Sequence, residues 1–370
     1  MTLVHSNYLK EALTFAPAHS RGKVYWTAPS NIALVKYWGK KGEQYPQNPS
    51  LSFSLNNSVT KTEISYQYVD GMNFPEVNFI FQGKKDEKFR ERISTYLKII
   101  LPYFPFLKQL KLDIHSENTF PHSAGIASSA SSFAALSLGL CSIEKNIKET
   151  SVNEADFFRK SSFIARLGSG SACRSIFGGF NTWGAHPSLE GSTDEYSLHL
   201  QENTIHPDFW TLNDSILIIE SGAKQVSSST GHKLMNGHPF ASSRFDQANR
   251  NFVDLIKALA AGDIHSFIQI VENEALSLHA MMLSSIPGYV LLRPNSLEII
   301  RKIRLFREKE NCNVFFTIDA GPNIHLLYFD KDKEKIQRFI KTELADLCEN
   351  QHWINDRIGE GPAELIKKTK

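Results

Sequence analysis

The chain has few cysteines and no long apolar segment. Its 370 residues include four cysteines, Cys141, Cys173, Cys312 and Cys348. They are scattered without CxxC spacing, which argues against a zinc site or a disulfide framework and fits a reducing compartment. Apolar runs such as residues 216–219 are far too short to span a bilayer. Residues 1–23 contain acidic Glu11 and lack the apolar core of a signal peptide, so we expect a soluble cytoplasmic protein.

The chain also lacks an excess of charge of either sign. Its 41 basic and 39 acidic residues give a net charge of +2, which provides no general reason to expect nucleic acid or a membrane surface as a partner. An anionic ligand would therefore need cations placed locally. With 41% apolar and 22% charged residues the composition is that of a globular protein, and the length allows one large domain or two smaller ones.

The most unusual segment, residues 121–132, has neither the GxxxxGK[ST] nor the GxGxxG spacing. It follows an alternating strand pattern at residues 110–114 and leads into a helix. Small residues at such a junction let the backbone approach a ligand, and the helix N-terminus offers N–H groups and a positive dipole end to a phosphate. Ser128, Ser129 and Ser131 add hydroxyl groups that could bind phosphate or its metal. The alternative is an Ala/Ser-rich helix that packs tightly.

Two further segments combine small or aromatic residues with cations. Lys36 and Lys40 flank two aromatic residues and a glycine, so they could clamp a polyanion or simply form a solvated lysine face. Residues 168–175 contain several serines and Arg174. A guanidinium binds carboxylate or phosphate in a two-pronged way, which favours an anion pocket here. The alternative for this segment is a helix-capping loop.

Two polar segments follow apolar strands. Residues 224–231 form a run of hydroxyl side chains, a pattern that is usually a loop. Asp319 stands at the end of a strand before a tight turn, where a carboxylate is either a turn former or a base kept ionised by a nearby lysine. Four histidines show no shared ligand spacing, and we interpret them as structural or surface residues. They are His232, His265, His279 and His325.

Periodicity predicts a mixture of strands and helices. Strands are expected at residues 23–29 (ending at Pro29), 61–68, 77–82, 198–200, 214–220, 314–318 and 324–329. Helices are expected at residues 86–101, 243–261, 264–283, 296–308 and 333–345, together with one that a capping box at Ser151 opens and Gly168 ends. Residues 1–23, apart from a short helix at 8–13, and residues 183–194 are expected to be irregular. Because there is no regular βαβ alternation, an α+β fold is favoured, with a domain change near residues 204–207.

Four segments together resemble the diphosphomevalonate decarboxylases, which belong to the GHMP small-molecule kinase superfamily. They are residues 28–40, 120–131, 165–175 and 319–323, and they occur in the family's order. The glycine/serine loop alone would indicate only a kinase of this superfamily. The sequences Lys-Tyr-Trp-Gly-Lys at 36–40, Gly-Ser-Gly-Ser-Ala-Cys-Arg at 168–174 and Asp-Ala-Gly-Pro-Asn at 319–323 are typical of the decarboxylase branch.

The resemblance implies the ATP- and Mg²⁺-dependent decarboxylation of mevalonate 5-diphosphate to isopentenyl diphosphate, with release of ADP, phosphate and carbon dioxide. Asp319 would orient or deprotonate the substrate hydroxyl group, Lys36 would tune its charge and assist phosphoryl transfer, and Arg174 would hold the substrate carboxylate or diphosphate. The substrate diphosphate would be bound by Tyr37, Lys40, Ser169, Ser171, Arg174 and Ser228. The ATP phosphates would be bound by Pro121, Ser123, Ala124, Gly125, Ala127, Ser128, Ser129 and Ser131, with Ser129 also at the metal.

The resemblance also implies a two-lobed α+β fold of the GHMP-kinase type. Residues 1–205 would form the N-terminal lobe with the phosphate loop, and residues 206–370 a ferredoxin-like C-terminal lobe, with the active site between them. Family members are commonly homodimers, and we expect no nucleic-acid or membrane partner.

Some positions depart from the family pattern. His122, Ser123 and Ile126 are mild departures, and residues 227–229 align only loosely, which makes Ser228 the least secure site residue. The alternatives are a phosphomevalonate decarboxylase, a mevalonate 3-kinase-like enzyme and a catalytically inactive metabolite-binding protein. The presence of Lys36 together with Asp319 argues against the last two of these alternatives.

Overall fold

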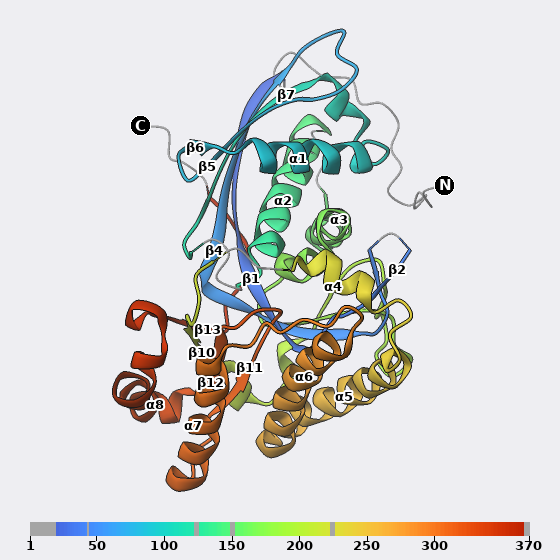
Figure 1. Cartoon of the computed structure of the whole chain (residues 1–370). Coiled ribbons are helices and arrows are strands. Elements are labelled where there is room, and N and C mark those ends of the chain that lie inside the picture. The colour runs from blue at the N-terminus through green and yellow to red at the C-terminus, as the bar shows by residue number, and fades with distance from the viewer. Residues whose placement is uncertain (1–19, 43, 122–125, 149–151, 223–225, 366–370) are drawn as a thin grey trace.

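Two long antiparallel strands, β1 (Arg21–Val35) and β4 (Ser50–Tyr68), run through the middle of the molecule (Figure 1). The computed structural model describes residues 20–42, 44–121, 126–148, 152–222 and 226–365. Trp26 and Ile64 pack in the core of the N-terminal lobe, whereas Ile32 and Phe53 pack in a second core that includes residues of the C-terminal lobe. The two strands therefore belong to both lobes.

The prediction that the first strand ends at Pro29 is wrong, because β1 continues to Val35. The register between β1 and β4 shifts between Pro29 and Asn31. Proline, which has no N–H to donate, thus lies at an irregularity where the ladder is already interrupted. The strand continues past the irregularity and ends immediately before Lys36.

The large sheet has the strand order β14-β1-β4-β7-β5-β6, and β8 and β9 extend it beside the first part of β4. Its other strands are β5 (Glu76–Phe81), β6 (Lys84–Lys85), β7 (Leu110–Asn118), β8 (Phe180–Trp183), β9 (Leu198–His199) and β14 (Ala363–Glu364). A separate two-stranded hairpin consists of β2 (Lys40–Lys41) and β3 (Tyr45–Pro46). The strands predicted at 61–68, 77–82 and 198–200 are confirmed.

Three helices lie along one face of this sheet, α1 (Glu87–Ile100), α2 (Ser128–Lys148) and α3 (Glu154–Gly168) (Figure 1). The helix predicted at residues 86–101 is confirmed as α1, and Asp86 caps it by accepting the Phe89 N–H. The predicted capping box at Ser151 is wrong, because α3 begins later and Asn153 caps it through the Ala155 N–H. Ser151 itself lies outside the described residues, as does the short helix predicted at residues 8–13.

The C-terminal lobe has a four-stranded antiparallel sheet in the order β11-β12-β10-β13. Its strands are β10 (Leu212–Leu217), β11 (Phe315–Thr317), β12 (Ile324–Phe329) and β13 (Trp353–Arg357). Its helices are α4 (Ser228–Leu234), α5 (Ala241–Ala261), α6 (Ile264–Ser284), α7 (Pro294–Glu310) and α8 (Lys333–Phe339). With helices between β10 and β11 and between β12 and β13, the lobe follows the ferredoxin-like βαββαβ order. The strand predicted at 214–220 begins and ends earlier, and the long helices are confirmed.

Shorter helical segments connect these elements. They are Pro105–Gln109, Gly170–Ile176, Glu202–Thr204, Pro207–Thr211, Asp330–Asp332, Ile340–Leu344, Ala345–Leu347 and Glu349–Gln351. All four cysteines are buried and have free thiols. In the part of the chain that the structure describes, no helix combines the length and the apolar character needed to cross a membrane.

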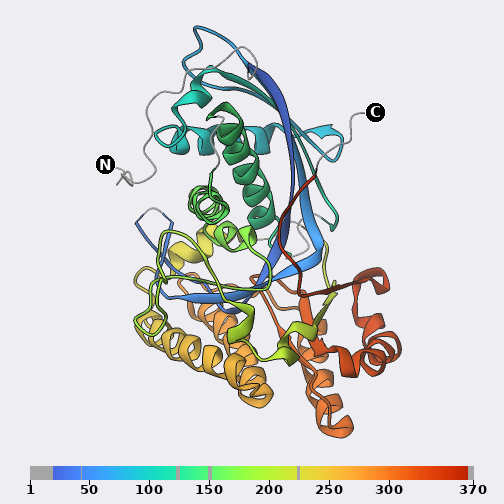
Figure 2. The same ribbon diagram turned by 180° about the vertical axis from the view of Figure 1, so that it is seen from behind.

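The end of the chain returns to the N-terminal lobe. In Figure 2 the dark red C-terminal segment runs upward beside the long strands, and its last strand, β14, pairs with Trp26 and Thr27 of β1. Asp356 accepts main-chain hydrogen bonds from residues 56, 57 and 58 of β4. The architecture is the predicted two-lobed α+β fold, with a strand of the second half of the chain added to the first sheet.

Candidate active site

A cavity of about 640 Å³ lies between the two lobes. The N-terminal lobe contributes the end of β1, the segment after it, the start of α2 and the short helix Gly170–Ile176. The C-terminal lobe contributes the start of α4, one side chain of α6 and the turn after β11. A cavity of this size at the junction of two lobes is typical of a small-molecule site.

The cavity is strongly cationic although the whole chain is nearly neutral. Among the described residues that line it, five carry a positive charge and one carries a carboxylate. The cations are Lys36, Lys40, Lys88, Arg92 and Arg174, and the carboxylate is Asp319. The local placement of cations that the sequence analysis required for an anionic ligand is therefore present.

Lys36 and Asp319 form an ion pair in this cavity, with 2.8 Å between Nζ and Oδ1. The Lys36 side chain is 2% exposed, whereas 23% of the Asp319 side chain remains accessible. A cation at this distance favours the ionised form of the carboxyl group. The pair thus presents a carboxylate to the cavity and keeps its lysine behind it. The two residues that sequence reasoning combined as a base and its lysine are indeed in contact.

Arg174 is held rigidly from the side of the large sheet. Its Nε donates to Asn31 Oδ1 at 3.1 Å and its Nη1 to Ser50 Oγ at 2.5 Å. Burial lowers the pKa of this guanidinium from its ordinary value, while the charge of Asp319 acts in the opposite direction. The expected small-residue segment is a short helix, Gly170–Ile176, and Arg174 lies within it. An anion in the cavity would meet a cation that needs little reorganisation.

Tyr37 and Lys40 line the cavity on either side of Gly39. The Tyr37 hydroxyl is buried and has no hydrogen-bond partner among the described residues, and burial raises the pKa of this phenol. Burial, reinforced by the charges of Arg92 and Lys233, lowers the pKa of Lys40 to about 8. A buried donor without a partner and a cation surrounded by like charges both favour the arrival of an anion.

The start of α2 also lines the cavity, through Ala127, Ser128 and Ser129. Ala127 has φ +43°, a left-handed conformation that a non-glycine residue rarely adopts, directly before the helix. Strain of this kind clusters at functional turns. Ser123, Ala124 and Gly125 lie outside the described residues.

The structure does not bring every predicted residue into the cavity. Ser131 is fully buried and faces the sheet, where its hydroxyl is 2.6 Å from Thr60 Oγ1. Its predicted contact with a phosphate is therefore corrected to a packing role, because the sheet already occupies that face of α2. Pro121 is exposed and does not line the cavity.

The three serines predicted to bind the substrate diphosphate do reach the cavity. Ser169 and Ser171 line it from the N-terminal lobe, and the Ser169 hydroxyl is 3.5 Å from that of Ser129. Ser228, the least secure prediction, lines it from the opposite lobe. It is the first residue of α4, which Ser227 caps, so the hydroxyl run expected to be a loop begins a helix.

Sequence reasoning missed several cavity residues. His232 lies between the rings of Tyr37 and Trp38 and accepts the Gly39 N–H at Nδ1 over 2.9 Å. Burial lowers its pKa well below the ordinary value, so it is neutral. Lys88 and Arg92 reach the cavity from α1. Their spacing of four residues, which places two side chains on one helix face, was the available signal.

The described residues do not contain three or more His, Cys, Asp or Glu side chains grouped to hold a metal ion. Magnesium prefers oxygen ligands and is commonly held by one or two protein groups together with substrate phosphates. The hydroxyl groups of Ser128 and Ser129 at the start of α2 fit such a metal, which would arrive with a polyphosphate.

Comparison with known proteins identifies similar sequences over nearly the whole chain. Residues 28–196 match the family described as "Diphosphomevalonate decarboxylase-like N-terminal domain", and residues 215–367 match "Mevalonate 5-diphosphate decarboxylase C-terminal domain". The diphosphomevalonate decarboxylase of Candida albicans is 30% identical over 323 residues, which cover 84% of this chain and 85% of that protein.

Solved structures of mevalonate diphosphate decarboxylases also resemble the chain over most of its length. A mevalonate diphosphate decarboxylase from Staphylococcus aureus has a TM-score of 0.79 and 29% identity, over 94% of this chain and 98% of its own. A structure of "MDDEF in complex with MVAPP, AMPPCP and Magnesium" has a TM-score of 0.78 and 28% identity, over 93% of this chain and 99% of its own.

Proposed function

The chain belongs to the diphosphomevalonate decarboxylase family, and we propose that the cavity between its lobes is the site of the family's reaction. The enzyme uses ATP and Mg²⁺ to convert mevalonate 5-diphosphate into isopentenyl diphosphate, ADP, phosphate and carbon dioxide. The observation that carries the assignment of the site is the ion pair of Lys36 and Asp319 in a cavity rich in cations.

The first step is the phosphorylation of a tertiary hydroxyl group. Asp319 accepts the hydroxyl hydrogen bond and takes the proton as the oxygen attacks the γ-phosphorus of ATP. Lys36 keeps Asp319 ionised before the step and lies beside the phosphoryl group that is transferred. Bound Mg²⁺ would neutralise part of the charge on the ATP phosphates.

The second step breaks two bonds of the phosphorylated intermediate. The C–O bond breaks and phosphate leaves, so positive charge develops at the tertiary carbon. The bond between the carboxylate carbon and its neighbour then breaks, carbon dioxide departs, and the electron pair forms the new double bond. Arg174, fixed by Asn31 and Ser50, holds the carboxylate or the adjoining diphosphate in the orientation that this fragmentation needs.

We assign the two polyphosphates to two neighbouring sets of cavity residues. Tyr37, Lys40, Ser169, Ser171 and Ser228 bind the substrate diphosphate, which would give the buried Tyr37 hydroxyl the partner it lacks among the described residues. The ATP phosphates are bound at the N-terminus of α2, by Ser123, Ala124, Gly125, Ala127, Ser128 and Ser129, and Ser129 would ligate the metal.

Membership of the family also supports proposals about the domains, the oligomeric state and the compartment of the protein. We propose that residues 1–205 and 206–370 are its two domains, a division supported by two matches that cover residues 28–196 and 215–367. We further propose that the enzyme acts as a homodimer in the cytoplasm.

A product assay tests the function. The purified protein is incubated with ATP, Mg²⁺ and mevalonate 5-diphosphate, and ADP and carbon dioxide are measured together. We expect equal amounts of both. Release of ADP without carbon dioxide would indicate a kinase that stops at the phosphorylated intermediate. Turnover of the 5-monophosphate in preference to the diphosphate would indicate a phosphomevalonate decarboxylase.

A further inference from the structure

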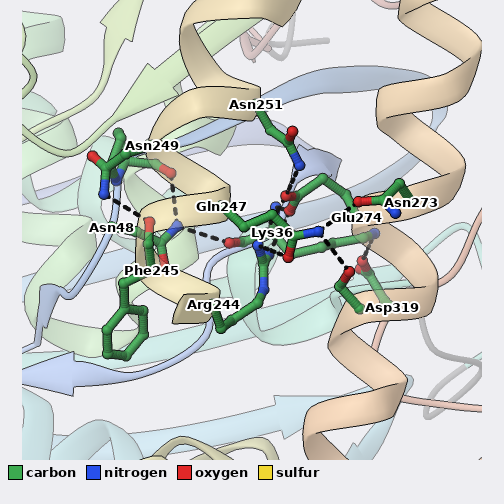
Figure 3. Close-up of polar contacts among 12 residues, drawn as sticks. Lys36, Asn48, Arg244, Phe245, Gln247, Asn249, Asn251, Asn273, Glu274 and Asp319 are labelled. Atoms are coloured by element: carbon green, nitrogen blue, oxygen red, sulfur yellow. Dashed lines mark hydrogen bonds and ion pairs between the residues drawn. The ribbon is translucent and has the colours of Figure 1, made fainter. Parts of the chain in front are cut away.

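Glu274 of α6 is a fully buried carboxylate that the proposed reaction does not use. Four hydrogen bonds converge on it (Figure 3). Its Oε2 accepts the main-chain N–H of Lys36 at 2.8 Å. Its Oε1 accepts from Asn251 Nδ2 at 2.6 Å, and both carboxylate oxygens pair with the two terminal nitrogens of Arg244. Glu274 therefore connects two helices of the C-terminal lobe to the main chain of a reacting residue.

Lys36 depends on this contact because it has left the sheet. β1 ends at Val35, so the polar main-chain groups of Lys36 no longer belong to a strand ladder. Its N–H donates to Glu274, and its carbonyl accepts from Asn48 Nδ2 at 3.0 Å. Both groups are thus held by side chains, and the aliphatic stem is buried. These contacts hold the main chain of Lys36 in place, and with it the start of the side chain that carries the amine.

Helix α6 also holds the other member of the ion pair. His279, five positions after Glu274, lies with Nε2 3.0 Å from the main-chain oxygen of Asp319. A carbonyl only accepts, so Nε2 carries the proton. Burial lowers the pKa of His279 to about 4, which makes the ring neutral at physiological pH. A rise of about 1.5 Å per residue separates the two anchor positions by roughly 7.5 Å along the helix.

We propose that α6 is the positioning element of the reaction, in which Glu274, held by Arg244, fixes Lys36 while His279 fixes Asp319. The inference rests on the proposed function of the cavity. Neither side chain needs to touch substrate. Because both anchors lie on one rigid helix, the 2.8 Å separation of Nζ and Oδ1 is kept when anionic substrates enter.

Stability alone does not account for this arrangement. A buried ion pair contributes little net stability compared with apolar side chains of the same volume, although removal of one partner is costly. The same helix supplies a comparison. Glu272, also buried, pairs with Arg307 of α7 at 2.7 Å and does not line the cavity. Glu272 and Glu274 are thus both buried glutamates paired with an arginine, but of the two only Glu274 contacts Lys36 or Asp319.

The test compares Glu274→Gln with the matched control Glu272→Gln in the full-length enzyme. Turnover is expressed per chain that binds AMPPCP, so that unfolded protein does not count. We expect kcat to fall about 10- to 100-fold in Glu274→Gln, since small misplacements of reacting groups cost this much. We expect KM for both substrates to change less than about threefold and Glu272→Gln to keep its kcat. An unchanged kcat in Glu274→Gln, or an equal loss in both variants, would overturn the proposal.

If Glu274→Gln does not fold, two variants of His279 test whether α6 positions the ion pair. His279→Leu removes the N–H that holds Asp319, whereas His279→Gln retains an N–H at similar reach. We expect kcat to fall about tenfold in the first and to recover at least partly in the second. Equal kcat in the two His279 variants would contradict the proposal. The wild-type product assay separates this failure from that of the proposed function, because only the latter leaves the wild type without equal release of ADP and carbon dioxide from mevalonate 5-diphosphate.

Discussion

At the residue scale, two lysines four positions apart have opposite electrostatic surroundings. Lys36 has a carboxylate partner 2.8 Å away, whereas Lys40 is partly buried near Arg92 and Lys233 and its Nζ contacts only a neutral amide, that of Gln44, among the described residues. The positive charge of Lys36 is therefore already paired with a carboxylate before substrate binds. The charge of Lys40 is available to a ligand, and its availability depends on pH.

We predict that KM for mevalonate 5-diphosphate rises above pH 8. The pKa of Lys40 is lowered to about 8 by burial first and like charges second, so the cation is present below that pH and is lost as the pH rises through it. A bound diphosphate favours the charged form, and KM should increase up to about tenfold per pH unit. Steady-state KM measured from pH 7 to 10 checks this.

Lys40→Arg should flatten that profile, because a guanidinium keeps its proton throughout the range. Lys41→Arg is the matched control, since the Lys41 side chain is half exposed, pairs with Asp194 at 3.0 Å and does not line the cavity. A profile that bends at the same pH in Lys40→Arg as in the wild type would show that another group titrates.

Asp319→Asn should nearly abolish turnover. The amide cannot take the hydroxyl proton, and loss of a general base typically costs 10²- to 10⁴-fold in rate. The affinity for AMPPCP, measured by calorimetry, should change less than about twofold, because the residues proposed to bind ATP are unaltered. Near-normal turnover would remove Asp319 from its proposed role.

At the element scale, the sequence predicted most helices and strands because their apolar periodicity is strong, but it did not predict which faces meet. The first four turns of helix α2 carry small or apolar residues on every face, and the helix is buried along most of its length. No periodicity indicates that Ser131 faces the sheet while Ser129 faces the cavity. His232 was missed for a similar reason, since its contacts with Tyr37 and Gly39 join residues far apart in the sequence.

The junction between α3 and the cavity depends on a glycine. A Cβ at Gly168 would clash with Cδ1 of Phe133, whose ring is buried in the core of the N-terminal lobe. We predict that Gly168→Ala lowers the free energy of unfolding by about 1–3 kcal/mol, the usual cost of overpacking a core. Urea denaturation followed by circular dichroism measures the change.

Gly222→Ala is the control for that substitution. Among the described residues the nearest atom to a Cβ at Gly222 would be Glu220 Cγ at 4.0 Å, and the Gly222 backbone is not left-handed, so we expect a change below about 0.5 kcal/mol. Because Ser169 follows Gly168 directly, Gly168→Ala should also raise KM for mevalonate 5-diphosphate. Equal stability of the two variants would mean that the Phe133 ring moves aside at little cost.

At the scale of the whole molecule, the two proposed domains share a hydrophobic core. The core around Ile32 and Phe53 also contains Ile216 of the C-terminal sheet and Phe252 of α5. Strand periodicity could not indicate this sharing, because it reports that a residue is buried and not which element covers it. We therefore expect the lobes to unfold together, in a single transition.

Asp356 of β13, which is 4% exposed, connects the C-terminal sheet to β4 through hydrogen bonds. Its carboxylate accepts the main-chain N–H groups of Asn56, Asn57 and Ser58 at 2.7–2.9 Å. In Asp356→Ala these donors lose their acceptor, and that of Ser58 is buried where water reaches it poorly. We predict a loss of about 2–4 kcal/mol in the free energy of unfolding. Calorimetry should still record one transition, at a lower temperature.

The control is Asp346→Ala, which removes an exposed carboxylate. Among the described residues this carboxylate accepts one hydrogen bond, from the side chain of Gln351. We expect a change below about 1 kcal/mol there. Two separated transitions in Asp356→Ala would show that the lobes are independent units linked by this carboxylate. Unchanged stability would show that the shared core alone joins them. A single transition at a lower temperature is expected only if the shared core and strand β13 both join the lobes. The same connection keeps Lys36 of one lobe against Asp319 of the other.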